Sequence, residues 1–333
     1  MALKWGIASA GKIAHDFVNA LGTLSDDEHR VVAVGARDLN RSKGFAQRFG
    51  IPKAYGNYVE LAKDPNVEVV HIGMYNIHHM EVALLMLEHG KHVLVEKPMG
   101  MNAKQVQKIF SYAKQKNLFA MEGIWSRSFP CYEYIRKQID SGKLGDIVSV
   151  QVDFGAEGLK NEERFINKNL GGGSVLEVGV YPIQFSQFIF RNEPTSIKAH
   201  CTLNDEGVDL DMFAELSYGE YKVAKISATG IASPNNTATI IGTKGKMTIP
   251  SFWCPTSLID VDGSEKIWPL PKAKLEFNFT NSAGLRFEAD EVRKCIRGGK
   301  TESEKVSQNA SLAIARTEDE IRKQIGVKYS QDD

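Results

Sequence analysis

The sequence predicts an α/β protein of two domains: a Rossmann domain with a doubly wound parallel sheet, then an α+β domain built on a mainly antiparallel open sheet. Three observations carry this prediction. The 333-residue chain is too long for one ordinary hydrophobic core. Its first 120 or so residues alternate short apolar runs with helical patterns. Beyond residue 125, half-buried strand patterns separated by turn signals take over. We place the domains at 1–123 and 124–333, with the closing helices able to pack back on the first domain.

The first domain reads as strands and helices in alternation. Continuous apolar strands separated by helices are typical of a parallel sheet that is covered on both faces. The expected strands are Leu3–Ala8, Arg30–Ala36, Val67–Ile72, His92–Val95 and Leu118–Met121. The expected helices are Lys12–Leu21, Arg41–Phe49, Asn57–Lys63, His78–His89 and Ala103–Lys116.

The pattern changes in the second domain: Ile147–Phe154 alternates apolar and polar residues, and several strand-like runs with hairpin-type turn signals between them follow. Alternation indicates strands with one buried and one solvated face, as antiparallel sheets have. The expected strands are Ile147–Phe154, Ile197–Leu203, Met212–Tyr218, Tyr221–Thr229, Thr237–Ile241, Lys246–Ile249 and Ser257–Val261. The expected helices are Pro130–Ser141, Val175–Phe190, Glu288–Arg297 and Ala310–Ile325.

Composition excludes several classes of function. Lys+Arg and Asp+Glu are both 41, so neither nucleic acid nor a membrane surface is an expected partner. No apolar run is long enough to span a membrane, and Met1–Gly6 has no signal-peptide pattern. The four cysteines are scattered, which favours a reduced, cytoplasmic protein with free thiols. His78-His79 has no second ligand cluster at metal spacing, so we expect no metal.

A glycine-containing loop joins the first expected strand to the first expected helix. Gly6-Ile7-Ala8-Ser9-Ala10-Gly11 fits GxGxxG with alanine in the middle place. Such a loop turns tightly and points backbone N–H groups and a helix N-terminus at a pyrophosphate. The pattern alone is weak, but the strand, loop, helix and second strand follow in the order that a dinucleotide site requires. The residues expected at the cofactor here are Gly6, Ala8, Ser9, Gly11, Lys12 and Ile13.

The end of the second strand bears on which dinucleotide is bound. NAD enzymes usually place an acidic residue there, to hold the ribose 2′-hydroxyl. Here Ala36 and Arg37 stand at the strand end, with Arg41 one turn further on. Two guanidinium groups suit the oxygens of a 2′-phosphate, which favours NADP. The alternative is that both arginines are solvated surface residues and Asp38 takes the ribose.

A charged pair closes a buried strand at Glu96-Lys97-Pro98. The carboxyl ends of parallel strands are where doubly wound folds bind ligands, so both side chains are candidates for the cofactor site. A plain salt bridge at the strand end is the alternative.

With the phosphate loop and the segment Ile72–His79, this motif resembles the glucose–fructose oxidoreductase and inositol dehydrogenase family, over essentially the whole chain. Within the family the sequence is similar to the dimeric dihydrodiol dehydrogenases of animals. That resemblance implies a homodimer that uses NADP and oxidises an alcohol, diol or sugar, for example a benzene dihydrodiol to a catechol or D-xylose at C1. The segments that carry it are Met1–Gly6, Ala36–Leu39, Asp64–Val69, Gly242–Gly245 and Trp253–Thr256.

The resemblance also implies roles for individual residues. Lys97 would lie beside the nicotinamide and the reacting hydroxyl. Asn76 and His79 would lie along the dinucleotide. Many members carry a catalytic histidine heading a helix of the second domain, whereas this chain has Tyr181 there, as dihydrodiol dehydrogenases do. Glu177 would support Tyr181 in catalysis, but it departs from the pattern, because those enzymes usually have aspartate at this position. The expected aromatic substrate pocket consists of Trp125, Phe154, Trp253 and Phe279.

Tyr181 suits this chemistry because dehydrogenation needs a base for the hydroxyl proton while hydride leaves for the nicotinamide. A nearby lysine ammonium and the positive nicotinamide ring would both favour phenolate. From the residues alone, Tyr181 could equally be a buried aromatic of its helix. The run Gly171-Gly172-Gly173 before that helix could be a hinge or simply a helix start.

Other patterns keep alternatives open. Tyr112-x-x-x-Lys116 and Tyr218-x-x-x-Lys222 both have the spacing of short-chain dehydrogenases. Two such matches in one chain show that the pattern has little specificity. Competing functions are a carbonyl or dicarbonyl reductase of another substrate, including a larger one such as a tetrapyrrole, and a non-catalytic NADP-sensing regulator. A regulator would need neither Lys97 nor Tyr181.

Overall fold

The computed structural model describes residues 1–333 and divides them into two compact units, which are taken separately below. Unit 1 contains Met1–Met99, Lys104–Ser128 and Leu270–Gln308. Unit 2 contains Gly100–Ala103, Phe129–Pro269 and Asn309–Asp333. None of the helices combines the length and the apolar character that crossing a membrane would require.

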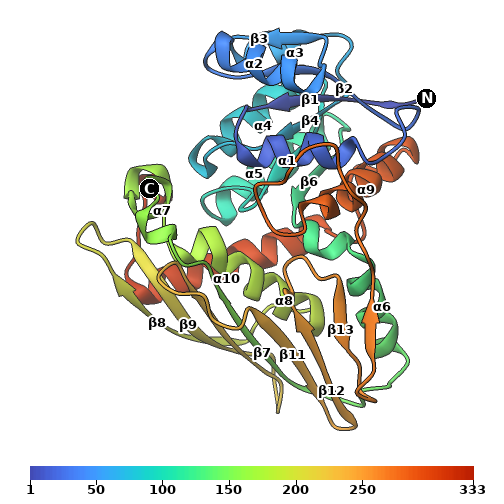
Figure 1. Cartoon of the computed structure of the whole chain (residues 1–333). Helices are drawn as coiled ribbons and strands as arrows, with labels where there is room; N and C mark the ends of the chain where they lie inside the picture. The colour runs from blue at the N-terminus through green and yellow to red at the C-terminus, as the bar shows by residue number, and fades with distance from the viewer. The chain divides into compact units, whose positions relative to one another are not determined.

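Unit 1 is built on a six-stranded, wholly parallel sheet (Figure 1). Its strand order is β3-β2-β1-β4-β5-β6, so the chain starts in the middle, winds to one edge and then to the other. This order confirms the predicted doubly wound Rossmann sheet. The strands are β1 (Leu3–Ala8), β2 (His29–Gly35), β3 (Lys53–Tyr55), β4 (Val69–Ile72), β5 (His92–Glu96) and β6 (Ala120–Gly123).

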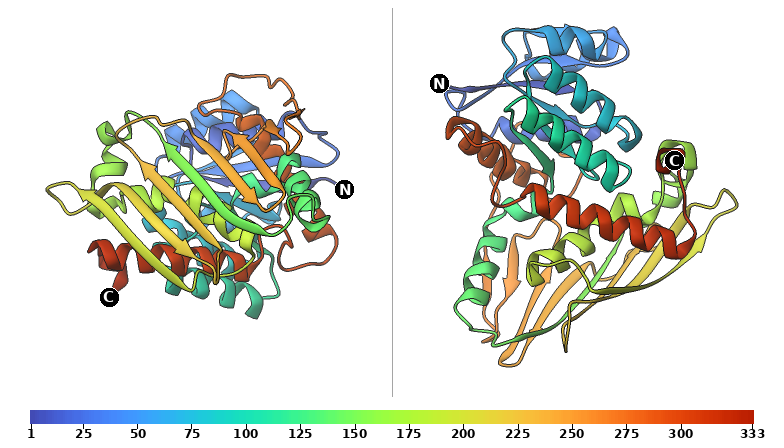
Figure 2. Two further views of the ribbon diagram at one scale, coloured as in Figure 1. Left: turned by 90° about the horizontal axis from the view of Figure 1, so that it is seen from below. Right: turned by 180° about the vertical axis from the view of Figure 1, so that it is seen from behind.

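Helices cover both faces of this sheet. Helix α1 crosses in front of the strands in Figure 1, and α4 and α5 cross in front of them when the molecule is seen from behind in Figure 2. Layers on both sides explain why β1, β4 and β5 are almost entirely buried. The helices are α1 (Lys12–Leu21), α2 (Leu39–Phe49), α3 (Tyr58–Lys63), α4 (His79–Glu88), α5 (Ala103–Gln115) and α9 (Leu285–Arg297).

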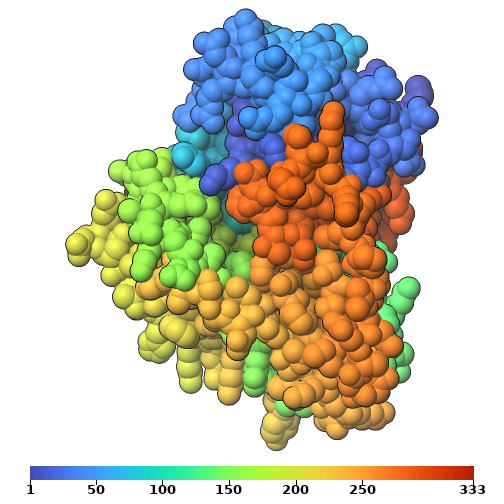
Figure 3. Space-filling model, viewed as in Figure 1, coloured from blue at the N-terminus to red at the C-terminus, as the bar shows by residue number.

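The segment 270–284 joins unit 1 after the chain has completed most of unit 2. It runs over α1, as the orange chain in Figures 1 and 3 shows. The buried Asp16 of α1 accepts hydrogen bonds from the backbone N–H groups of Asn278 and Phe279, both at 2.9 Å. Asn19 donates to the carbonyl of Leu275 at 2.7 Å. These bonds fasten the segment to the helix that begins at the phosphate loop.

Unit 2 is built on an eight-stranded sheet in the order β14-β13-β12-β11-β7-β10-β9-β8. Neighbouring strands are antiparallel except β7 and β10, which pair in parallel. The predicted mainly antiparallel open sheet is therefore confirmed. The strands are β7 (Ile147–Gly155), β8 (Ser196–Leu203), β9 (Asp209–Ser217), β10 (Val223–Thr229), β11 (Thr237–Gly242), β12 (Gly245–Pro250), β13 (Ser257–Ile259) and β14 (Glu265–Ile267).

Helices gather on one face of this sheet, and the strands of the other face are in full view in the left panel of Figure 2. Helix α8 packs on β7 and β10, while α10 reaches β8, where Gln324 accepts a hydrogen bond from the Ala199 amide at 3.1 Å. The burial pattern of β9 and β10 alternates, as expected for one covered and one open face. The helices of unit 2 are α6 (Pro130–Asp140), α7 (Glu163–Ile166), α8 (Val180–Phe190) and α10 (Gln308–Ile325).

Candidate active site

The loop between β1 and α1 has the form that a pyrophosphate site requires. Gly11 is the N-cap residue of α1, and no side chain caps that helix end. Ser9 has a φ of +127°, which side chains rarely adopt and which clusters at ligand sites. A Cβ on Gly6 would lie 2.9 Å from Val67, so glycine is needed there for close packing. Backbone N–H groups at a helix N-terminus then face the ligand, with the positive end of the helix dipole behind them.

Three charged residues follow β2: Asp38 caps the next helix, and Arg37 and Arg41 are cations. Asp38 caps α2: its Oδ1 accepts from the backbone N–H groups of Asn40 at 2.7 Å and Arg41 at 3.1 Å. Arg37 and Arg41 are both exposed. Burial raises the pKa of Tyr58, and Arg37 and Arg41 oppose that rise, so both guanidinium groups lie near the same phenol. The two predicted arginines thus lie near each other, and Asp38 Oδ1 is used as the cap of α2.

Glu96 is the last residue of β5 and is largely buried. Its Oε1 lies 3.1 Å from Nε2 of His71 on the neighbouring strand β4. The ring of Phe17 stacks on His71 at a centroid separation of 4.0 Å. The predicted cofactor-side carboxylate is therefore held at the carboxyl end of the sheet by a histidine, which is itself fixed by an aromatic ring.

His79 lies between the backbone next to Lys97 and the backbone that follows β4. Its Nδ1 lies 2.8 Å from the carbonyl oxygen of Pro98 and its Nε2 lies 3.0 Å from that of Met74. Burial lowers the pKa of His79, with the two carbonyl contacts opposing. Both ring nitrogens thus face backbone oxygens, so His79 orders the chain around Lys97. Asn76 is also buried, and its Oδ1 accepts from the Ile77 amide at 3.0 Å.

Tyr181 lies in the first turn of α8 in unit 2 and is 8% exposed. The ring of Phe154, from β7, meets it edge to face at 5.3 Å between centroids. Trp253 lies 4.6 Å from Phe154 in turn. Two of the four predicted pocket aromatics are thus grouped with the predicted acid/base. Such a cluster offers ring faces suited to an aromatic ring or the apolar side of a sugar.

The other two predicted pocket residues belong to unit 1. Trp125 is 6% exposed and opens a short 3-10 helix, Trp125–Ser128. Phe279 is 41% exposed on the segment fastened to α1. Lys97 is likewise in unit 1. The predicted site residues therefore fall into two groups: the phosphate loop, the arginines and Lys97 belong to unit 1, and Tyr181 with its aromatic neighbours belongs to unit 2.

Glu177 precedes Tyr181 by four residues and is paired. Its Oε2 lies 2.6 Å from Nη1 of Arg164, and Nε of the same guanidinium group lies 2.6 Å from Oε2 of Glu162. Burial would lower the pKa of Arg164, but Glu177 and Glu162 together raise it above its ordinary value. Glu177, the departure seen in the sequence, is thus ion-paired to Arg164 of α7.

The start of the Tyr181 helix differs from the sequence-based expectation of one continuous helix. Val175–Gly179 form a π-helical turn, η5, before α8 begins at Val180. Asp209 is completely buried beneath it and accepts from Ser174 Oγ and the Val175 amide, both at 2.7 Å. Burial raises the pKa of Asp209 to about 6, although these two hydrogen bonds act in the opposite direction. Single π-turns within helices occur frequently at functional sites.

Sequence reasoning missed several charged residues around these groups, among them the buried Asp209 and the half-buried Arg164. Asp209 and Arg164 carry no local motif, and only the fold brings them to Ser174 and Glu177. In unit 1, burial raises the pKa of Glu288 on α9 well above its ordinary value, and the charge of Glu96 adds to that rise. The only signal in the sequence was an acid on the apolar face of an amphipathic helix.

Comparison with known proteins covers nearly the whole chain. Residues 3–124 match the model of an oxidoreductase family with an NAD-binding Rossmann fold (GFO/IDH/MocA), and residues 132–248 match the C-terminal domain model of the same family. The chain is 45% identical to trans-1,2-dihydrobenzene-1,2-diol dehydrogenase of Danio rerio, over 100% of this chain and 99% of that protein. It is 41% identical to the enzyme of that name from Homo sapiens, with the same coverage.

A solved structure with the same fold is KijD10, a 3-ketoreductase from Actinomadura kijaniata in complex with NADP and TDP-benzene. The TM-score is 0.82 at 22% identity, and the alignment covers 99% of both chains. This likeness supports the two-domain architecture along the whole length.

Proposed function

Because the chain belongs to the GFO/IDH/MocA oxidoreductase family and is an enzyme with its nicotinamide-dinucleotide Rossmann fold, we propose that it transfers hydride between NADP and a secondary alcohol, diol or sugar hydroxyl. The observation that carries the proposal is Tyr181, set at the head of α8 within an aromatic cluster in place of the histidine common in the family. The full-length relatives at 41–45% identity are named for the oxidation of a benzene dihydrodiol. A trans-dihydrodiol, oxidised to a catechol, is therefore the first substrate class, and an aldose such as D-xylose, oxidised to its lactone, is the second.

The chain's own residues divide the work. The bound dinucleotide supplies the hydride acceptor at its nicotinamide ring. Tyr181 takes the hydroxyl proton as the carbon–hydrogen bond breaks, and the electron pair of the O–H bond forms the carbonyl. Lys97 hydrogen-bonds the same hydroxyl oxygen and, being cationic, favours the phenolate. In reduction, Tyr181 returns the proton. Phe154 and Trp253 exclude water and hold the ring or the apolar face of the substrate.

The preference for NADP over NAD rests on the residues after β2. Asp38 would have to hold a ribose hydroxyl in an NAD enzyme, but its Oδ1 accepts two backbone hydrogen bonds as the cap of α2. Arg37 and Arg41 are exposed beside it and lie near the same phenol, Tyr58. Two cations and an occupied carboxylate suit a 2′-phosphate.

The purified protein is expected to reduce NADP in the presence of trans-benzene dihydrodiol or D-xylose, and to do so more slowly with NAD. The measurement is the absorbance of the reduced cofactor, followed over a panel that also contains dicarbonyls assayed in the reverse direction. Turnover of dicarbonyls alone would replace the diol with a carbonyl substrate. Tight NADP binding without turnover of any panel member would favour a dinucleotide-sensing regulator and contradict the proposed activity.

The open face of the unit 2 sheet supports a second proposal, that two copies of the chain associate through it. Its strands present rows of mixed charge with an aromatic among them: Lys198 pairs across from Glu215, and His200 across from Phe213, which is 57% exposed. A face that carries both signs of charge around an exposed ring can match its own copy about a twofold axis.

Substituting Phe213→Lys is expected to convert a dimer to a monomer, because it places a cation at the exposed aromatic of that face. Light scattering coupled to size-exclusion chromatography gives the mass. Val148→Lys is the matched control, since Val148 is 36% exposed and alternates with Gln151 and Asp153 onto the other face of β7. A monomeric wild type, or a dimer that survives in Phe213→Lys, would contradict the assignment.

A further inference from the structure

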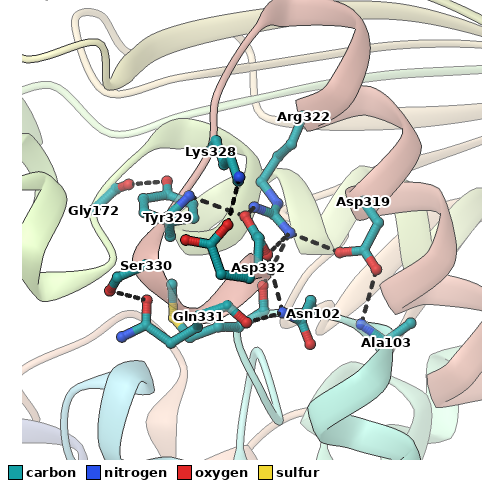
Figure 4. A network of polar contacts seen from close by, with 12 residues as sticks. Asn102, Ala103, Gly172, Asp319, Arg322, Lys328, Tyr329, Ser330, Gln331 and Asp332 are labelled. Carbon is teal, nitrogen blue, oxygen red and sulfur yellow. Dashed lines mark hydrogen bonds and ion pairs between the residues drawn. The ribbon is translucent and has the colours of Figure 1, made fainter.

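The residues 329–332, here called the C-terminal strap, follow helix α10 and lie at the centre of a polar network in unit 2 (Figure 4). Arg322, 3% exposed, donates to Asp332 Oδ2 at 2.7 Å and to Asp319 Oδ1 at 2.7 Å. Its guanidinium also lies over the ring of Tyr329, 5.2 Å from the centroid. Asp332 Oδ2 in addition accepts from the Tyr329 amide at 2.9 Å. The strap is therefore folded onto a buried cation rather than extended from the helix.

One end of the network reaches the glycine run that precedes Tyr181. The hydroxyl of Tyr329 donates to the carbonyl oxygen of Gly172, as the dashed line in Figure 4 marks. The Tyr329 side chain is 2% exposed, and burial raises its pKa, so the hydroxyl keeps its proton. Gly173 has a φ of +131°, and a Cβ there would lie 2.3 Å from Asp209 Oδ1 and 2.9 Å from the Tyr329 hydroxyl. The glycine run is thus confined between Tyr329 and Asp209 and is not a free hinge.

The π-turn η5 connects the confined glycine run to Tyr181. Asp209 holds Ser174 and Val175, the residues at which η5 begins, and Tyr181 follows in the next turns of the same helical stretch. A π-turn changes the angular position of every side chain that follows it relative to an α-helix. The direction of the Tyr181 phenol therefore depends on where η5 starts, and the start is fixed by Gly172 and Ser174.

The other end of the network holds the chain shortly after Lys97. Asn102 Nδ2 donates to the Gln331 carbonyl oxygen and to Asp332 Oδ1, both at 2.9 Å. Asp319 Oδ2 accepts from the Ala103 amide at 2.9 Å, and Arg322 donates to the Met101 carbonyl oxygen at 3.1 Å. The segment Gly100–Ala103 is accordingly part of unit 2 although Lys97 is in unit 1. One network holds backbone five residues after Lys97 and nine residues before Tyr181.

We infer that the C-terminal strap is a positioning element for hydride transfer: Tyr329, through Gly172, sets the start of the Tyr181 helix, while Asp332, through Asn102, sets the chain that follows Lys97. The inference rests on the proposed function, because it assigns the strap to the two residues proposed to act on the substrate hydroxyl. None of the strap contacts belongs to the phosphate loop or to Arg37 and Arg41. Loss of the strap should therefore impair the chemical step and spare dinucleotide binding.

Tyr329→Phe tests this with the ring and its packing retained. We expect kcat to fall about 10- to 100-fold, as small displacements of reacting groups do, with the dissociation constant for NADP within twofold of wild type. The primary deuterium isotope effect on kcat, measured with substrate labelled at the transferred hydrogen, should rise because the chemical step becomes limiting. A merely structural loss would lower the active fraction and leave the isotope effect unchanged. Asp332→Asn, at the other end of the network, should show the same pattern.

Lys328→Ala is the matched control. Lys328 is adjacent to the strap, but its side chain is 67% exposed and forms an ion pair with Asp333 at 2.5 Å. It should keep the kcat and isotope effect of wild type. An equal fall of kcat in Lys328→Ala, or an unchanged isotope effect in Tyr329→Phe, would overturn the inference.

Amide hydrogen exchange tests the role of the strap independently of the proposed reaction, because the measurement needs no substrate. In Tyr329→Phe the amides of 171–181 are expected to exchange faster than in wild type, while those of 6–15 stay unchanged. Unchanged exchange in 171–181 would overturn the strap whatever the assays give. Faster exchange in a protein whose wild type oxidises no alcohol would count against the proposed reaction instead.

Discussion

Tyr181→Phe is expected to lower kcat by about 10³-fold, within the 10²–10⁴-fold range that a positioned acid or base contributes. The substitution removes one oxygen atom and leaves the ring to pack on Phe154 as before. Without the hydroxyl, no group of the chain is assigned to take the proton as hydride departs. Lys97→Met should cause a comparable loss, since it removes both the contact to the reacting oxygen and the charge that favours phenolate. Steady-state kinetics with NADP and the best diol or sugar, beside NADP binding by fluorescence, measures both.

The chain provides its own controls for this experiment. Tyr112 and Tyr218 each precede a lysine by four residues, the spacing that short-chain dehydrogenases use. Tyr112 lies on α5 with Lys116 over its ring, and Tyr218 is 9% exposed and stacks on Phe190. Tyr112→Phe and Tyr218→Phe should both keep near-normal kcat. If Tyr181→Phe retains wild-type turnover, or if either control loses as much, the acid/base role lies elsewhere.

The sequence was most informative where local pattern and tertiary packing agree. β1 and α1 begin and end where predicted, because a continuous apolar run and an amphipathic helix are separated by an unmistakable glycine loop. The short edge strands β3 and β14 were missed, since three residues with little burial leave no periodic signal. The position of the segment 270–284 could not be predicted for a different reason: its hydrogen bonds to Asp16 join residues more than 250 positions apart in the chain.

The candidate site was predictable to the extent that motifs mark it. GxGxxG, the two arginines and Glu96-Lys97-Pro98 each sit at the end of a strand, and the parallel topology brings strand ends to one edge of the sheet. The residues that hold the start of the Tyr181 helix have no sequence motif. Asp209 begins β9, Tyr329 follows α10, and neither is near Tyr181 in sequence. A π-turn also has no composition of its own, so the sequence predicted the helix over Val175–Phe190 without indicating that its first five residues are π-helical.

The choice of cofactor should depend on Arg37 more than on any other single side chain. Arg37→Asp is expected to raise the KM for NADP by about 10²-fold, because a charge-assisted hydrogen bond contributes roughly 1.5–3 kcal/mol and the new carboxylate repels the phosphate. The KM for NAD should change by less than about threefold, since NAD carries no 2′-phosphate to lose the contact or to be repelled. The measurement is kcat/KM for both dinucleotides at one saturating substrate concentration.

Arg48→Asp makes the same charge change in the last turn of α2, the helix that follows Arg37, and should leave both constants close to wild type. High salt gives a second check, because an exposed arginine–phosphate contact is screened: the KM of wild type for NADP should rise with ionic strength and that of Arg37→Asp should not rise further. The cap of α2 sharpens the interpretation. Asp38 Oδ1 already accepts from Asn40 and Arg41, so turning that oxygen toward a ribose hydroxyl would uncap the helix. Equal losses with NADP and NAD would mean that Arg37 supports the loop rather than the phosphate.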